Sequence, residues 1–409
     1  VLDRHADRRR RCGEDAVRIV YSIGTTVGAG GLGVDSLEAL RAIYAEGYLA
    51  KVVAYGNRQS EIPASMFRCV GFLNPTRIFA NLPARYYYPI KRKYLDRLAR
   101  RELARGADLF HGWSSSSLES LRFCRARGIV SILENPGPYC TVAESLIDAE
   151  YAALGVRRKS QPAVFRSFFA QDEAYHLAEY AHADYILCES SYTLETFAEH
   201  GVSRDRLLLV PRGVDLDRFS PAPAKGRTPF RALFVGALRV RKGIRYLLEA
   251  WDSLRLPGAE LILAGTVSDD VAPLLERCVS RNPSIRLAGH VKDPVDLYRS
   301  ASVFVFPSLS EGSAKVCYEA MACGLPVVVT PNAGSVARDG VEGFLVPPHD
   351  AEALSGRIER LYRDEETREA MGRAARARMR EFTWETHRER LLELYRKVHR
   401  REPAPDRPL

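Results

Sequence analysis

A single stretch in the second half of the chain decides the fold class. Residues 302–330 read SVFVFPSLSEGSAKVCYEAMACGLPVVVT: an apolar run of strand length, a short loop, a segment with helical spacing and a second apolar run. Two buried strands joined through a helix form a parallel βαβ unit. The same alternation begins at Phe230 and includes the strand-like runs FRALFVGAL, AELILAGT and IRLAGHV. It predicts a parallel sheet with helices on both faces, which is a doubly wound α/β domain.

The first half shows a looser version of this pattern. It opens with the strand-like run VRIVYSI (17–23), followed by a glycine-rich loop, a helix-like segment (34–46) and the apolar run LAKVVAYG (49–56). A chain of 409 residues suits two domains. We expect a basic tail (1–16), a Rossmann-like domain (17–209), a linker rich in proline and glycine (210–229), a second Rossmann-like domain (230–380) and a C-terminal helix (381–409).

The composition is typical of a globular protein, with 46% hydrophobic and 27% charged residues. No apolar run approaches the length of about 20 residues that a membrane helix needs. The basic start lacks the apolar segment of a signal peptide, so we expect a cytoplasmic protein. The eight cysteines form no C-x-x-C pair, and we therefore expect neither a zinc site nor a redox site.

The net charge of +9 favours anionic partners. Positive residues concentrate between Lys91 and Arg105, where they alternate with leucine and tyrosine. Two interpretations stay open. The segment is either a basic amphipathic helix on an acidic membrane face, peripheral on the inner side, or an ordinary helix with a solvated basic side. No aromatic-rich platform for single strands accompanies the charge, so nucleic acid is not an expected partner.

The glycine-rich loop contains Gly28, Gly30 and Gly33, which spell G-x-G-x-x-G. A dinucleotide site needs the first glycine at the strand end and an acidic residue about 20 positions further on. Here residues 24–27 separate Gly28 from the strand-like run, and the next run ends in VVAYGNRQ without an acidic residue. We interpret the loop as a backbone that faces the diphosphate of a sugar donor. A nicotinamide site and a plain strand-to-helix connection remain the alternatives.

Two glutamates flank a predicted helix start in the second half. Glu311 lies in the loop after a strand, Gly312 and Ser313 are expected to open the helix, and Glu319 follows about two turns inside. A carboxylate at Glu319 suits the two hydroxyls of a ribose, and one at Glu311 suits those of a neighbouring sugar. The free N–H groups of the helix start suit anionic oxygen. The alternative is a surface ion pair between Lys315 and Glu319.

The E-x7-E spacing followed by EAMACGLPVV resembles the retaining glycosyltransferases of the GT-B fold that use nucleotide-sugar donors. FVGALRVRKGIRYLLEAW, VPRGVDLDRFSP and TPNAGSVARDGVEGFLVP resemble further segments of that family. The resemblance implies two Rossmann-like domains facing across a cleft, with the C-terminal helix returning toward the first. It also implies retaining transfer of a sugar from a nucleotide-diphosphate donor, but it does not specify the sugar. We expect a hexose-type sugar and UDP or GDP. The basic segment from Lys91 to Arg105 would hold the protein at a membrane, so we expect a glycan or lipid-linked acceptor of cell-surface polysaccharide or glycolipid synthesis.

The resemblance also assigns site residues. Catalytic positions fall on His111, Lys242 and Glu311. Donor-binding positions fall on Gly30, Gly31, Arg212, Gly236, Arg239, Arg241, His290, Gly312, Ser313, Ala314 and Glu319. The family's frequent arginine falls on Ala237, so Arg212, Arg239 or Arg241 would replace its charge at the diphosphate. The second histidine of the family's H-x-H pair is Trp113 here, and a lone histidine at a strand end also has a structural interpretation.

We expect neither a metal nor a cofactor. The sequence DLD at residues 215–217 spells the D-x-D motif of metal-dependent transferases, but it lies in the predicted linker. Cationic side chains and oriented N–H groups stabilise a departing diphosphate equally well in a dry cleft. Two other functions stay open: an NAD(P)-dependent oxidoreductase that uses the glycine loop, and a non-catalytic adaptor on a membrane surface.

Overall fold

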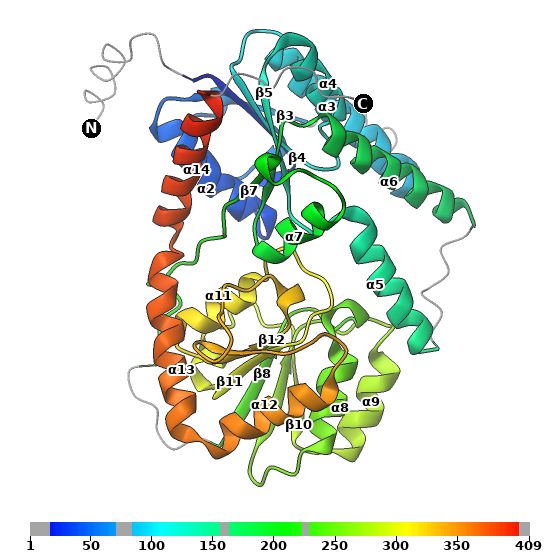
Figure 1. Cartoon of the computed structure of the whole chain (residues 1–409), viewed down its shortest axis with the longest axis vertical. Coiled ribbons are helices and arrows are strands. Elements are labelled where there is room, and N and C mark those ends of the chain that lie inside the picture. The colour runs from blue at the N-terminus through cyan, green and yellow to red at the C-terminus, as the bar shows by residue number, and fades with distance from the viewer. Residues whose placement is uncertain (1–16, 71–83, 156–162, 223–228, 401–409) are drawn as a thin grey trace. The chain divides into compact units, whose positions relative to one another are not determined.

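A computed structural model describes residues 17–70, 84–155, 163–222 and 229–400. Two sheets of seven and six strands form the framework, and every described pairing between named strands is parallel (Figure 1). Contacts divide the chain into two compact units. The first contains the described parts of Val1–Asn135, Pro162–Leu187 and Arg388–Leu409, and the second those of Pro136–Gln161 and Cys188–His387. Two parallel sheets with helices confirm the predicted doubly wound α/β class.

The first sheet has the strand order β3-β2-β1-β4-β5-β6-β7. Its strands are β1 (Ile19–Val27), β2 (Leu49–Asn57), β3 (Phe67–Cys69), β4 (Leu109–Trp113), β5 (Val130–Asn135), β6 (Tyr185–Cys188) and β7 (Leu207–Leu209). The helices along this part of the chain are α2 (Leu32–Ala45), α3 (Ala84–Leu103), α4 (Leu118–Arg127), α5 (Cys140–Ala153), α6 (Ala163–His182) and α7 (Ser191–Glu199). The residues of β1 from Ile19 to Ile23 are all buried, and Ile19, Val20 and Ile23 contribute apolar side chains to the core.

The second sheet has the order β10-β9-β8-β11-β12-β13. Its strands are β8 (Arg231–Val235), β9 (Glu260–Ala264), β10 (Ile285–Gly289), β11 (Val303–Phe306), β12 (Val327–Val329) and β13 (Gly343–Leu345). The helices are α8 (Ile244–Ser253), α9 (Ala272–Arg281), α10 (Val295–Ser300), α11 (Lys315–Ala322), α12 (Ala351–Arg363), α13 (Glu365–Arg378) and α14 (Trp384–His399). The strand order reverses between β8 and β11. In open α/β sheets, ligands bind outside the carboxyl ends of the strands at such a point.

The first strand is longer than predicted. It continues through residues 24–27 after a shift in register between Ile23 and Thr26, so Gly28 follows the strand directly. One of the two arguments against a dinucleotide site was therefore wrong. The other stands, because β2 ends at Asn57 with no acidic residue at its tip. At Gly33 a Cβ atom would lie 2.4 Å from the carbonyl oxygen of Thr26, so the close packing of α2 on β1 requires glycine.

The basic segment lies on α3 and turns its apolar residues inward. Leu95, Leu98 and Leu103 are buried in the core of the first unit. The outer face of the helix carries a stripe of exposed positive residues, Lys93, Arg97, Arg100 and Arg101, and the exposed Arg105 follows the end of the helix. The leucines are therefore not available for insertion into a membrane, and this is the geometry of a helix with a solvated basic side. Among the described helices, none is both long and apolar enough to cross a membrane.

The described residues of Pro136–Gln161, which follow β5, group with the second unit, although the sequence suggests a boundary only at residue 209. The reason is a set of buried polar contacts made by α5. Tyr246 donates a hydrogen bond of 2.7 Å to Glu150, and Tyr151 donates one to Asp270. The end of α14, from Arg388 on, groups with the first unit, where Arg396 pairs with Glu46 at 3.0 Å. The predicted domain limits otherwise stay predictions.

Candidate functional site

The loop between β11 and α11 brings several predicted site residues together. The helix begins at Lys315, so Gly312 and Ser313 lie in the loop before it. The prediction that these two residues begin the helix was wrong. The cause is tertiary pairing of the backbone. The amides of Glu311 and Ala314 donate to the carbonyls of Asn332 and Ala333, both at 2.9 Å. Glu319 is the fifth residue of this helix and therefore lies little more than one turn from its start.

Gly312 is the tightest point of this loop. A Cβ atom there would lie 2.0 Å from the carbonyl oxygen of Pro136, so only glycine fits. The carbonyl of Gly312 accepts hydrogen bonds from the hydroxyls of Ser190 and Thr193, the second at 3.2 Å. Both hydroxyls lie at the start of α7, and the whole arrangement belongs to the second unit. The packing against Pro136 and the hydrogen bonds from Ser190 and Thr193 thus fix the peptide groups that follow Glu311.

The sequence analysis missed Ser190 and Thr193. The sequence ESSYT does show the start of a helix, since Ser190 accepts a hydrogen bond of 3.1 Å from the amide of Thr193. Nothing in that pattern indicates that the same hydroxyls also bind a carbonyl more than 100 residues further along the chain.

Glu311 is the centre of a charged cluster. Its Oε1 atom accepts hydrogen bonds from the ammonium of Lys242 and from the hydroxyl of Ser308, the latter at 3.0 Å, and pairs with Arg241 at 2.9 Å. The Glu311 side chain is 13% exposed and that of Lys242 14%, so the pair lies in a largely dry environment. Burial lowers the pKa of Lys242, while the carboxylate of Glu311 opposes that shift. The predicted proximity of Lys242, Arg241 and Glu311 is present in the structure.

The lysine is positioned by a short 3₁₀ turn, Val240–Lys242, that follows β8. Gly243 ends this turn with φ +67°, and a Cβ atom there would lie 1.9 Å from the carbonyl oxygen of Pro307. The backbone carbonyl of Arg241 accepts from the amide of Leu309 at 2.9 Å. These contacts bind the lysine-bearing turn to the glutamate-bearing loop, which explains why a glycine must follow the lysine.

Glu319 is almost completely buried, with 4% of its surface exposed. Its Oε2 atom accepts a hydrogen bond of 2.9 Å from the hydroxyl of Tyr298. Burial raises the pKa of Tyr298 well above its usual range, so this hydroxyl keeps its proton. The Oε1 atom lies 3.2 Å from the ammonium of Lys315, whose side chain is 45% exposed. The predicted pair with Lys315 exists, but it is not a surface pair, since the carboxylate itself is buried.

The other predicted donor-binding residues are more scattered. Arg239 is exposed at the start of the 3₁₀ turn, and His290 is exposed directly after β10. Arg212 is buried and lies 3.5 Å from Glu189. Among the three arginines, Arg241 is the one that contacts Glu311. Gly236 has φ +149° and lies against the rings of Phe234 and Phe306.

The two glycines of the first loop belong to the first unit. Gly31 has φ +65° and precedes α2, and a Cβ atom at Gly30 or Gly31 would meet no atom within 4 Å. The loop is therefore open on this side. Its role at a donor diphosphate stays a prediction, as do the other roles assigned to single residues.

His111 occupies a polar network inside the first unit. It is completely buried on β4, its Nδ1 atom lies 2.6 Å from the hydroxyl of Tyr395, and its Nε2 atom lies 2.8 Å from a carboxylate oxygen of Glu134. Burial lowers the pKa of His111 to about 3, so the ring is neutral. Trp113, at the position of the missing second histidine, donates to the hydroxyl of Tyr21 at 2.7 Å. This geometry supports the structural interpretation of His111, and the catalytic role stays a prediction.

We expect the stability of the protein to fall by about 2 kcal/mol between pH 7 and pH 5 through His111 alone. The folded-state pKa of about 3 lies below the unfolded-state value, so the contribution is present above about pH 6.5 and is lost as the pH falls. Urea unfolding at both pH values measures it. His111→Gln should remove this part of the pH dependence, whereas His290→Gln, at an exposed position, should not. An unchanged dependence in His111→Gln would contradict the assignment.

The D-x-D motif forms a turn. The Oδ1 atom of Asp215 accepts from the amides of Asp217 and Arg218, both at 3.0 Å. Within the part of the chain that the structure describes, no group of three or more histidine, cysteine, aspartate or glutamate side chains could hold a metal ion. Sugar transfer without a metal therefore stays a prediction.

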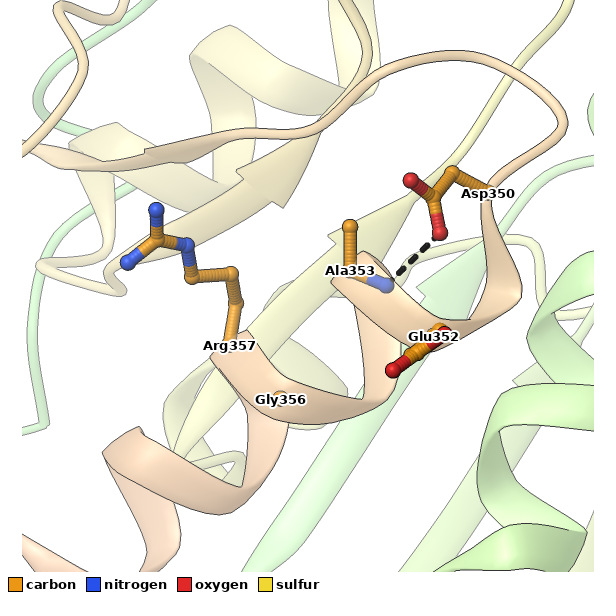
Figure 2. A pocket seen from close by; sticks show the side chains of 5 residues that line it. All are labelled: Asp350, Glu352, Ala353, Gly356 and Arg357. Carbon is orange, nitrogen blue, oxygen red and sulfur yellow. Dashed lines mark hydrogen bonds between the residues drawn. The ribbon is translucent and has the colours of Figure 1, made fainter.

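A separate hollow of about 570 Å³ lies at the start of α12 (Figure 2). Asp350, Glu352, Ala353, Gly356 and Arg357 line it. The carboxylate of Asp350 caps the helix by accepting from the amide of Ala353 at 2.8 Å. None of the predicted site residues lines this hollow, so it is not part of the candidate site.

Two protein families match the chain in succession. Residues 29–218 match "Glycosyltransferase Family 4", and residues 229–364 match "Glycosyl transferases group 1". The D-inositol 3-phosphate glycosyltransferase of Xylanimonas cellulosilytica is 32% identical over 227 residues, which are 50% of this chain and 54% of that protein. The capsular polysaccharide biosynthesis glycosyltransferase CapM of Staphylococcus aureus is 33% identical over 154 residues, 36% of this chain and 40% of CapM. The chain thus spans about half the length of the first of these relatives, and less of the second.

Solved structures share the fold over nearly the whole chain. Sucrose-phosphate synthase from Thermosynechococcus elongatus has a TM-score of 0.67 at 22% identity, covering 93% of this chain and 99% of that one. Anabaena HepE in complex with UDP and glucose has a TM-score of 0.63 at 16% identity, covering 93% and 100%. At these identities the similarity shows the fold alone.

The matches set aside the two other functions that the sequence left open, the NAD(P)-dependent oxidoreductase and the non-catalytic adaptor. Both family matches are to glycosyltransferases, one in each half of the chain, and the solved structures have the same pair of parallel sheets. The chain therefore carries a domain of each of two glycosyltransferase families, Glycosyltransferase Family 4 and Glycosyl transferases group 1, and it has the GT-B fold.

Proposed function

We propose that the protein transfers a hexose-type sugar from a nucleoside-diphosphate sugar to a glycan or lipid-linked acceptor, with retention of configuration and without a metal. The observation that carries the proposal is the cluster of Glu311, Lys242 and Arg241 at the carboxyl end of the second sheet, in which Glu311 and Lys242 are largely buried and Arg241 is partly exposed. Two positive groups beside one carboxylate leave a surplus of positive charge. A departing diphosphate needs such a surplus in its transition state.

Each side chain has a role in this proposal. Glu319 accepts the two ribose hydroxyls of the donor, and Lys315, which is exposed, moves away from Oε1. The diphosphate binds Lys242 and Arg241, and this releases Glu311 to bind hydroxyls of the donor sugar. In the reaction the bond between the anomeric carbon and the diphosphate oxygen breaks, and the oxygen of an acceptor hydroxyl bonds to the anomeric carbon while its proton passes to the departing diphosphate. Retention rests on the family resemblance.

Relatives support the class of substrate. HepE is known in complex with UDP and glucose, CapM is named for capsular polysaccharide biosynthesis, and another relative is an O-antigen chain mannosyltransferase from Escherichia coli. We propose that the donor carries UDP or GDP and that the product belongs to cell-surface polysaccharide or glycolipid synthesis. The exposed positive stripe on α3 would hold the protein to the inner face of a membrane by charge alone, at about 1 kcal/mol per residue.

Titration with UDP-glucose, UDP-galactose, GDP-mannose and NAD tests the donor class. We expect one nucleotide sugar to bind and NAD not to bind. With a membrane extract as acceptor source, sugar transfer should match the release of nucleoside diphosphate and should persist in a chelator. Sedimentation with anionic and neutral vesicles, at low and high salt, tests the membrane contact. Binding of NAD alone, or transfer that stops in the chelator, would contradict the proposal.

A further inference from the structure

Two buried hydroxyls in the first unit have no hydrogen-bond partner among the described residues. Ser22 is 0% exposed and Ser116 is 2% exposed, and the Oγ atom of each lacks a partner. A buried hydroxyl without a partner costs about 1–3 kcal/mol, so such groups call for an explanation. Ser116 follows the carboxyl end of β4, where α/β proteins bind ligands, and Ser22 lies in the neighbouring strand β1, where it pairs with Gly112 of β4.

The two hydroxyls come from β1 and from the loop that follows its neighbour β4. Ser22 pairs in register with Gly112 of β4, and a Cβ atom on Gly112 would lie 2.4 Å from Oγ of Ser117, the residue after Ser116. A Cβ atom on Gly24 would lie 3.5 Å from Oγ of Ser116 and 3.6 Å from the ring of Tyr55. Gly24 itself is exposed. Gly24 therefore adds no side chain that would cover the hydroxyl of Ser116 or the neighbouring ring of Tyr55.

A lysine without a counter-charge completes this group. The ammonium of Lys91 lies 3.8 Å from the ring centroid of Tyr55 and 5.6 Å from that of Tyr87. Within the described residues no carboxylate pairs with Lys91, which is partly buried, and burial lowers its pKa. Buried charges are normally paired, so an unpaired ammonium stacked on an aromatic ring suits an anion from outside. Lys93, two residues further on, is exposed and does not share this environment.

We propose that Ser22, Ser116 and Lys91 form a subsite for the acceptor, and that the acceptor presents a sugar-like hydroxyl to the serines and an anionic group to the lysine. Assigning the subsite to the acceptor rests on the proposed function. The subsite itself rests on the contacts of the first unit alone. The proposal names the substrate class as a hydroxyl-rich anion, either a phosphate ester or a carboxylate.

Three probes with one ring distinguish these chemistries: glucose, glucuronate and glucose 6-phosphate. Isothermal titration of the full chain at low salt should show at least one charged probe binding about tenfold more tightly than glucose. The charged group that gives the gain identifies the anion. Lys91→Met, which keeps the aliphatic stem on Tyr55, should abolish the gain, and the matched variant Lys93→Met should preserve it. Equal affinity for all three probes, or equal effects of the two lysine variants, would overturn the proposal.

The serines have a readout that separates ligand binding from a structural role. Ser22→Ala and Ser116→Ala should each weaken binding of the preferred probe by about threefold or more, while the urea midpoint rises or stays unchanged because an unpaired hydroxyl has been removed. A lower midpoint would show that these hydroxyls bind structural water, against the proposal. Nucleotide-sugar binding is measured separately on the same variants. Its absence in the unmodified protein would refute the proposed function without touching the result for the probes.

Discussion

Lys242→Ala should lower the rate constant of sugar transfer by about 10²–10³-fold, with a much smaller change in the KM for the donor. The ammonium of Lys242 is largely buried beside Glu311 and Arg241. Charge on the leaving diphosphate grows in the transition state, so a cation in this dry position stabilises the transition state more than the bound donor. Steady-state kinetics with the preferred nucleotide sugar measure both constants.

Two arginines serve as controls for this prediction. Arg239 is exposed at the start of the same turn, and Arg239→Ala should change the rate constant by less than about threefold. Arg241 contacts Glu311 at 2.9 Å but is 37% exposed, so Arg241→Ala should have an effect between the other two. A rate constant in Lys242→Ala above one tenth of the original, in a protein with an unchanged urea midpoint, would refute the role of the lysine.

Much of the fold was predictable because its signals are local. The apolar runs of β8, β9, β11 and β12 and the helical spacing between them are visible within windows of about ten residues. Local signals failed where tertiary pairing overrides them. Residues 24–27 contain glycine and threonine and look like a loop, yet they pair with β2 after a register shift. The start of α11 was predicted too early because the backbone of the loop is bound to residues 332 and 333.

The charged residues of the candidate site were predictable from the sequence, but the residues that contact and orient them were not. Glu311, Glu319 and Lys242 follow from the family pattern, and the structure places Lys242 against Glu311. Tyr298, which donates a hydrogen bond to Glu319, lies in the separate helix α10. No sequence motif around Tyr298 indicates this role. One of the two partners of His111 is Tyr395, 284 residues away, so the sequence alone left two interpretations of the histidine. To predict such contacts, one must know which distant segments of the chain meet in the fold.

Glu319→Gln should weaken donor binding by about 30- to 150-fold, which corresponds to about 2–3 kcal/mol. The amide keeps the volume of the carboxylate and still accepts a hydrogen bond from Tyr298. However, it offers one acceptor oxygen where the carboxylate offers two, and its NH₂ group faces the second ribose hydroxyl as a donor. Since 6% of the side chain is exposed, water does not compensate for the loss. Titration with the nucleoside diphosphate alone measures the effect without the sugar.

The two partners of Glu319 make the test specific. Tyr298→Phe removes the hydrogen bond of 2.9 Å to Oε2 and should weaken nucleotide binding by about three- to tenfold, because the carboxylate keeps its charge but loses its fixed orientation. Lys315→Met removes a competitor from Oε1, so nucleotide binding should stay equal or become tighter. If Lys315→Met weakened binding as much as Glu319→Gln, the lysine would be the ligand-binding group, and Glu319 would serve only to hold it.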